Sequence, residues 1–151
     1  MANTAALANS FKVEMLNGIH AFGATVIRAA ANKDAFKMAL FLASATINAS
    51  TAVYSVTGEV SGAGYTAGGV SVTNATDPVL AGATATWTPS GAAAWTNVTL
   101  ATAFDAVLLY NATQANKAVG VYTFGSQTVT AGNFSLTMPV NDAANALLRV
   151  A

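Results

Sequence analysis

The chain contains no cysteine, which excludes disulfide bonds, a thiol nucleophile and metal sites built from thiolates. Charged residues make up only 8% of its 151 residues, whereas they make up about 25% of an average domain. Six basic and six acidic residues give a formal net charge of zero, so no basic patch is available for nucleic acid or for an anionic membrane surface. We therefore expect neither partner.

The scarcity of charge also describes the surface, which must consist largely of Ala, Thr, Ser, Asn and Gly. Such a surface can approach a neighbouring molecule without burying unpaired charges, which favours assembly into oligomers or larger particles. The alternative is a β-domain that simply carries Thr and Ser at its exposed strand positions. Composition alone leaves both open.

Hydrophobic residues are plentiful, at 54% with a mean hydropathy of +0.49, so the chain can bury a core as one domain over residues 1–151. The first residues carry no basic stretch ahead of an apolar one, and Lys12 and Glu14 follow early, so we expect synthesis in the cytoplasm without a secretory leader. The long uncharged stretches are rich in Thr, Gly and Asn, which argues against a membrane-spanning helix. Residues 1–17 are expected to form an N-terminal arm.

Alternation of apolar and polar residues predicts β-strands through most of the chain. We expect strands over residues 36–42, 83–88, 104–110, 118–124, 134–138 and 146–150. The near-continuous apolarity of 104–110 indicates a central strand that is covered on both faces. Trp87 should point inward, whereas the pattern around Trp95 leaves its orientation open.

Turn residues separate these segments at Asn116, Gly125-Ser126, 131–133 and 139–142. Nearer the N-terminus, 18–22 and 25–28 could form a hairpin, and 50–55 a short helical turn capped by Ser50. About eight short strands with turn signals between them predict an all-β fold, an antiparallel β-sandwich or barrel whose strand number suits a jelly roll.

A glycine-rich segment over residues 58–69 cannot hold a regular helix and should be an extended loop. It does not match a phosphate-binding loop, because Ala67 stands where the dinucleotide motif needs glycine and no Lys-Ser or Lys-Thr follows. We interpret the glycines as positions that need a positive φ or lie close to another backbone, either of the same chain or of a neighbour.

No constellation of catalytic or metal-binding residues stands out. His20 is the only histidine, and in its apolar context we expect a structural hydrogen-bonding role. The acidic residues are widely spaced, and no Gly-x-Ser-x-Gly motif is present. An aromatic platform for sugar could be formed by Trp87, Trp95, Tyr54, Tyr65 and Tyr122, although aromatic residues at strand period usually belong to the core. We expect no enzyme, cofactor or metal site.

Several segments in series resemble a family of small virion structural proteins of tailed bacteriophages. These segments are FKMALFL (36–42), EVSGAGYTAGG (59–69), AVLLYN (106–111), FG (124–125), FSLTMP (134–139) and ALLR (146–149). The second of them is the most specific, and the others count only through their order and spacing.

The resemblance implies a non-enzymatic component of the virion. Among virion roles we favour a capsid decoration, or cement, protein on the capsid surface, which bridges subunits of the major capsid protein and forms a dimer or trimer. The candidate inter-subunit contacts are Gly62, Gly64, Tyr65, Thr66, Gly68 and Gly69, together with the termini. The alternatives are a head-tail, neck or tail-fibre component, and a carbohydrate-binding module that uses exposed Trp87 or Trp95.

Overall fold

The computed structural model describes residues 3–8, 10–11, 15, 18–23 and 33–150. Within them the chain forms two antiparallel sheets, which confirms the all-β prediction. The strands are β1 (Ala6–Leu7), β2 (Phe36–Leu42), β3 (Val70–Ser71), β4 (Val79–Ala81), β5 (Thr84–Trp87), β6 (Ala93–Asn111), β7 (Lys117–Leu136) and β8 (Leu148–Val150). Among these residues no helix is long and apolar enough to cross a membrane.

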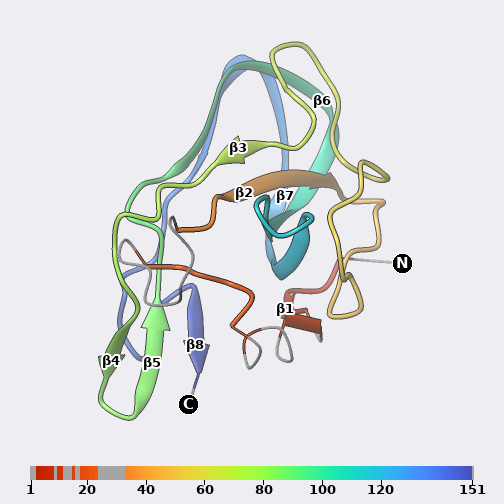
Figure 1. Cartoon of the computed structure of the whole chain (residues 1–151). Coiled ribbons are helices and arrows are strands. Elements are labelled where there is room, and N and C mark those ends of the chain that lie inside the picture. Colours follow the sequence, from red (N-terminus) through yellow and green to blue (C-terminus); the bar gives the residue numbers. More distant parts are fainter. Residues whose placement is uncertain (1–2, 9, 12–14, 16–17, 24–32, 151) are drawn as a thin grey trace.

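The larger sheet has the order β1-β7-β6-β2-β3, with β6 at its centre between β7 and β2 (Figure 1). Residues Ala106 to Asn111 of β6 are all buried, as the uninterrupted apolar sequence predicts for a strand covered on both faces. β2 has the predicted bounds and pairs with β6 in regular register from Phe36 to Phe41. The most reliable sequence signals therefore mark the middle of this sheet.

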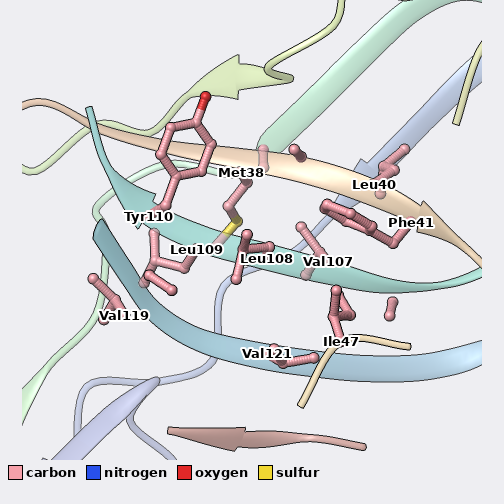
Figure 2. Close-up of a cluster of buried hydrophobic side chains, with 14 of the residues drawn as sticks. Met38, Leu40, Phe41, Ile47, Val107, Leu108, Leu109, Tyr110, Val119 and Val121 are labelled. Carbon is pink, nitrogen blue, oxygen red and sulfur yellow. The ribbon is translucent and has the colours of Figure 1, made fainter. Parts of the chain in front are cut away.

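The core lies on both faces of β2, β6 and β7 (Figure 2). Met38 and Leu40 come from one face of β2, and Ala39 and Phe41 from the other, yet none of the four is more than 1% exposed. A fully buried side chain of the size of Leu, Met or Phe contributes about 1.5–3 kcal/mol of hydrophobic free energy. Burial on both faces of the sheet thus explains why β2 has apolar residues at both its odd and its even positions.

The longest feature is the hairpin of β6, with 19 residues, and β7, with 20 residues. Its register shifts between Trp95 and Phe104 mark β-bulges, which bend a strand pair. Phe134, near the open end of the hairpin, consequently lies 5.0 Å from Phe104 and 5.6 Å from Phe124, measured between ring centroids. Figure 1 shows the paired strands curving away from β2 and descending toward β5.

This hairpin corrects several sequence predictions. The expected turns at 125–126 and 131–133 lie inside β7, so the expected strands 118–124 and 134–138 are one strand. Ala131 has φ 45° and Asn97 has φ 53°, the left-handed backbone that occurs in one type of β-bulge. Gly, Ser and Asn, which resemble turn residues in the sequence, serve here to bend a continuous strand. The expected turn at Asn116 is confirmed.

The smaller sheet has the order β4-β5-β8. Trp87 of β5 is 2% exposed, which confirms that it points inward, and the strand ends before Pro89 as expected. The ring centroid of Trp87 lies 4.8 Å from that of Phe22 and 5.8 Å from that of Phe36 in β2. Aromatic contacts therefore join the two sheets. The strand expected over 146–150 is shorter, from Leu148 to Val150.

Two expectations nearer the N-terminus are wrong. Residues 18–22 do not form a strand, and the partner segment 25–28 lies outside the described residues. Residues 50–55 do not form a helical turn: Val53 makes an isolated bridge to Lys117, and the Tyr54 N–H donates to the Asn116 carbonyl at 2.8 Å. Pairing with the start of β7 satisfies backbone groups here that a helical turn would leave unpaired.

The described part of the N-terminal arm belongs to the domain. β1 pairs with β7 at Gly120 and Val121 and forms one edge of the larger sheet. The Asn3 side chain donates to the Asp105 carboxylate at 2.7 Å and accepts from the Ile47 N–H at 3.1 Å. Residues 3–8 are therefore anchored to the sheet of their own chain.

Candidate functional site

The glycine-rich loop over residues 58–69 lies directly on the larger sheet of its own chain. A Cβ at Gly62 would fall 2.0 Å from the Thr99 carbonyl oxygen, and one at Gly69 would fall 1.9 Å from the Met38 carbonyl oxygen. Real Cβ atoms do not approach backbone so closely. This confirms the interpretation that the glycines permit close backbone approach, and the neighbouring backbone is the chain's own.

Positive φ angles also favour glycine at four positions of the loop. Gly58, Gly64, Gly68 and Gly69 have φ between 68° and 92°, a region that costs other residues about 1–2 kcal/mol. The loop also adds backbone pairing, since Ala63 forms an antiparallel bridge with Thr99 of β6. The loop is thus a fixed part of the fold, held from both of its ends.

A buried carboxylate anchors the loop. Glu59 is 7% exposed and accepts three hydrogen bonds: from the Tyr54 hydroxyl at 2.6 Å, the Tyr65 hydroxyl at 2.7 Å and the Gly68 N–H at 2.8 Å. The Tyr110 hydroxyl completes the network by donating to the Gly68 carbonyl at 2.7 Å. Hydrogen bonds to a charged acceptor each contribute about 1.5–3 kcal/mol. We call these five residues the Glu59 network.

The electrostatics of the Glu59 network keep its phenols protonated. Burial, followed by the hydrogen bond to Glu59, raises the pKa of Tyr65 and of Tyr54 well above the usual value. Burial and the negative charge of Glu59 raise the pKa of Tyr110 in the same direction. The tyrosines therefore act as hydrogen-bond donors, which makes the network a structural anchor.

The six candidate contact residues divide into two groups. Gly62, Gly64 and Thr66 are exposed, whereas Gly68 is buried and Gly69 is half-buried. Tyr65 is half-buried, and its hydroxyl both donates to Glu59 and accepts from the Leu40 N–H at 3.1 Å.

The exposed surface of the loop is consequently formed by residues 61–64 with Thr66 and Ala67. It contains neither charge nor a large apolar side chain. Tyr65 belongs to the fold, so its substitution would not leave the isolated domain intact, and Thr66 is the informative position for a test of contact. The surface suits close apposition to another protein.

A second buried polar centre surrounds His20. The Asn111 Oδ1 accepts from the N–H groups of Thr113 and Gln114, each at 3.1 Å, which fixes the amide orientation. Asn111 Nδ2 must then donate both to the Asp34 carboxylate at 2.8 Å and to His20 Nδ1 at 3.0 Å. Nδ1 of neutral His20 is therefore an acceptor, and its ring proton is on Nε2. This confirms the structural hydrogen-bonding role expected for His20.

Both tryptophans of the expected sugar platform are buried. Trp87 is 2% exposed and Trp95 is 3% exposed, so neither presents a ring to solvent. Phe134 packs against Trp95 with a centroid distance of 5.8 Å, which also settles the orientation that the sequence left open. A carbohydrate-binding module based on exposed Trp87 or Trp95 is therefore excluded.

Within the described residues, no three His, Cys, Asp or Glu side chains are grouped closely enough to hold a metal ion. Comparison with models of protein families, with curated proteins and with solved structures found no match. The interpretation of function therefore depends on the residues themselves and on the resemblance in sequence.

Sequence reasoning missed both buried acidic residues, Asp34 and Glu59, as organising groups. Glu59 could have been found from its position, because it is followed directly by the apolar Val60 and lies close to Tyr54 and Tyr65 in the chain. Buried acids need donors, and nearby phenols supply them. Asp34 offered no comparable local signal, since Asn111 reaches it from the far end of β6.

Proposed function

We propose that this protein is a non-enzymatic structural component of a phage virion, a decoration or cement protein that binds the outer surface of the capsid. It would stabilise the shell by bridging subunits of the major capsid protein as a homo-oligomer, a dimer or trimer. The proposal includes no nucleic acid, membrane or cofactor. The resemblance to small virion structural proteins supports it, and the loop surface gives it a physical basis.

The observation that carries the proposal is the fixed, uncharged surface at residues 61–64, Thr66 and Ala67. Binding loses less conformational entropy when the segments of the interface are already ordered in the free protein. The Glu59 network and the close backbone contacts of Gly62 and Gly69 supply that order. A surface without charge also avoids the desolvation penalty that buried ions would impose.

We propose further that the two sheets form the layers of a β-sandwich. The contacts of Trp87 with Phe22 and Phe36 support this, because they connect β5 of the smaller sheet to β2 of the larger one through the core. A sandwich presents its loops and edges around a rigid centre, a shape that suits repeated placement on a shell.

The first test is the copy number of this chain relative to the major capsid protein, measured by quantitative mass spectrometry of purified particles. We expect a number equal to that of the shell protein or a simple fraction of it. A much lower number would place the chain in the neck, tail or fibres, and its absence from particles would refute a virion role.

The second test is rebinding of purified protein to particles that lack it. Thr66→Lys places an unpaired charge in the proposed contact, so it should reduce binding, whereas Ala144→Lys adds the same charge at an exposed position in another segment. Both variants should unfold at the same denaturant concentration as the wild type. Equal binding of Thr66→Lys and the wild type would remove the loop from the capsid interface.

A further inference from the structure

The outer edge of β7 is only partly covered. Residues 52–54 pair with it at its start, and β1 together with Ala8, which follows β1, pairs with it from Val119 to Val121. Among the described residues, no strand pairs with this edge beyond Val121, although β7 continues to Leu136. An open strand edge presents N–H and C=O groups that can pair with another chain.

Proteins usually protect such an edge with charge, proline or bulges. Here no charged residue lies between Lys117 and Asp142. Bulges interrupt β7 up to Gly132, but Phe134, Ser135 and Leu136 pair with β6 in regular register. The residues 132–136 therefore form a short regular edge that lacks charged protection, just before Pro139.

The side chains of this segment alternate clearly. Phe134 and Leu136 pack on the core, and Asn133 and Ser135 are exposed. An antiparallel partner strand must keep the same alternation, or its apolar side chains would face solvent. A second copy of the segment meets this condition when a two-fold axis passes midway between the two copies of one residue. Every residue then faces one that lies an even number of positions away, so facing side chains point to the same face of the sheet.

We propose that a second copy of this chain pairs antiparallel with residues 132–136 of β7 and joins the two larger sheets across a two-fold axis. The segment is self-complementary: it brings no like charges together, and its exposed positions face small polar residues of the other copy. Pairing uses the open edge of β7 in both copies, so the assembly ends at a dimer. This inference does not depend on the proposed virion function.

The test uses sedimentation velocity over about a hundredfold range of protein concentration. The wild type should form a concentration-dependent dimer. Ser135→Lys places lysines near each other across the axis and should raise the dissociation constant about tenfold. The matched control is Ala94→Lys, because Ala94 is the exposed partner of Ser135 in β6, on the same face but one strand away from the edge. It should dimerise as the wild type does.

The absence of native cysteine permits a second measurement. Ser135→Cys should give a disulfide-linked dimer under mild oxidation, whereas Thr66→Cys, also exposed, should not. Circular dichroism and denaturant unfolding check that every variant is folded.

Three results would overturn the proposal: a wild type that stays monomeric at all concentrations, a dimer that Ser135→Lys leaves unchanged, or equal loss in both lysine variants, which would indicate contact through the sheet face. Loss of capsid binding in Ser135→Lys with an unchanged dimer would assign the edge to the capsid protein instead.

Discussion

Replacing Gly69 by alanine tests the claim that the glycine-rich loop is fixed by close backbone contact. Gly69 has φ +68°, and a Cβ there would lie 1.9 Å from the Met38 carbonyl oxygen and 2.7 Å from the Ala39 Cα. Gly82, between β4 and β5, has nearly the same φ of +66°, but nothing lies within 4 Å of its added Cβ. The two sites differ in contact and share their backbone strain.

The expected magnitudes follow from this difference. Gly82→Ala should cost about 1–2 kcal/mol, the strain of a left-handed alanine. Gly69→Ala adds a clash that only movement of the loop away from β2 can relieve. That movement would weaken the bonds that Gly68 makes to Glu59 and Tyr110. Loss of a charged and a neutral hydrogen bond brings the total to about 4 kcal/mol, a large share of the stability of a typical domain.

Denaturant unfolding measures both variants, with the fluorescence of the buried Trp87 and Trp95 as the signal. The reasoning requires the free energy of unfolding to fall at least about 2 kcal/mol further in Gly69→Ala than in Gly82→Ala. Equal losses in the two variants would refute it, because they would show that φ strain alone determines the glycine at this position.

All four tyrosines have a raised pKa, so the native protein should show little tyrosinate absorbance at pH 10. The free energy of unfolding should decline as the pH rises above about 10, because the tyrosines ionise there in the unfolded chain but not in the native protein. A tyrosinate signal from folded protein at pH 10 would contradict this prediction. The turn over residues 114–117 has a positive φ at both central residues, a conformation that asparagine adopts more easily than alanine. Ala115→Asn should therefore raise the free energy of unfolding by about 0.5–1 kcal/mol, measured by denaturant unfolding. A lower free energy of unfolding would contradict the turn assignment. Nitrogen NMR of neutral His20 should find its proton on Nε2, and a proton on Nδ1 would contradict the orientation of Asn111.

The strands that the sequence predicted correctly are those whose own side chains determine their burial. β2 and the second half of β6 carry apolar side chains at both odd and even positions, so both faces of these strands must be covered by the core. In place of β7 the sequence predicts two strands, 118–124 and 134–138, because Gly125 and Gly132 resemble turn residues. Their role depends on the bend of the hairpin against Phe104, which a local pattern cannot show. The jelly-roll arrangement stays a prediction.

In the candidate site, too, the features that follow from residue type were predicted, and those that depend on tertiary packing were not. Close backbone approach by the glycines followed from residue type, since few other roles require so many of them in one loop. That the approached backbone belongs to the same chain, and that Tyr65 faces Glu59, depends on tertiary packing. Sequence reasoning correctly predicted glycines that need a positive φ or a close backbone neighbour, but it included in the contact surface residues that the fold itself uses, Tyr65 and Gly68.

The burial of acidic residues strengthens the case for assembly. Two of the few acids, Asp34 and Glu59, are at most 7% exposed, so the low charge content of the sequence still overstates the charge that the surface displays. A surface so poor in charge loses the repulsion that keeps most soluble proteins apart. These two acids have structural roles, and each accepts several hydrogen bonds. Glu59 holds the glycine-rich loop, and Asp34 holds Asn111 at the end of β6. A fold that buries two of its six acids and leaves a surface rich in Thr, Ser, Ala and Gly is suited to contact with other protein surfaces, and the oligomer and rebinding experiments test where those contacts lie.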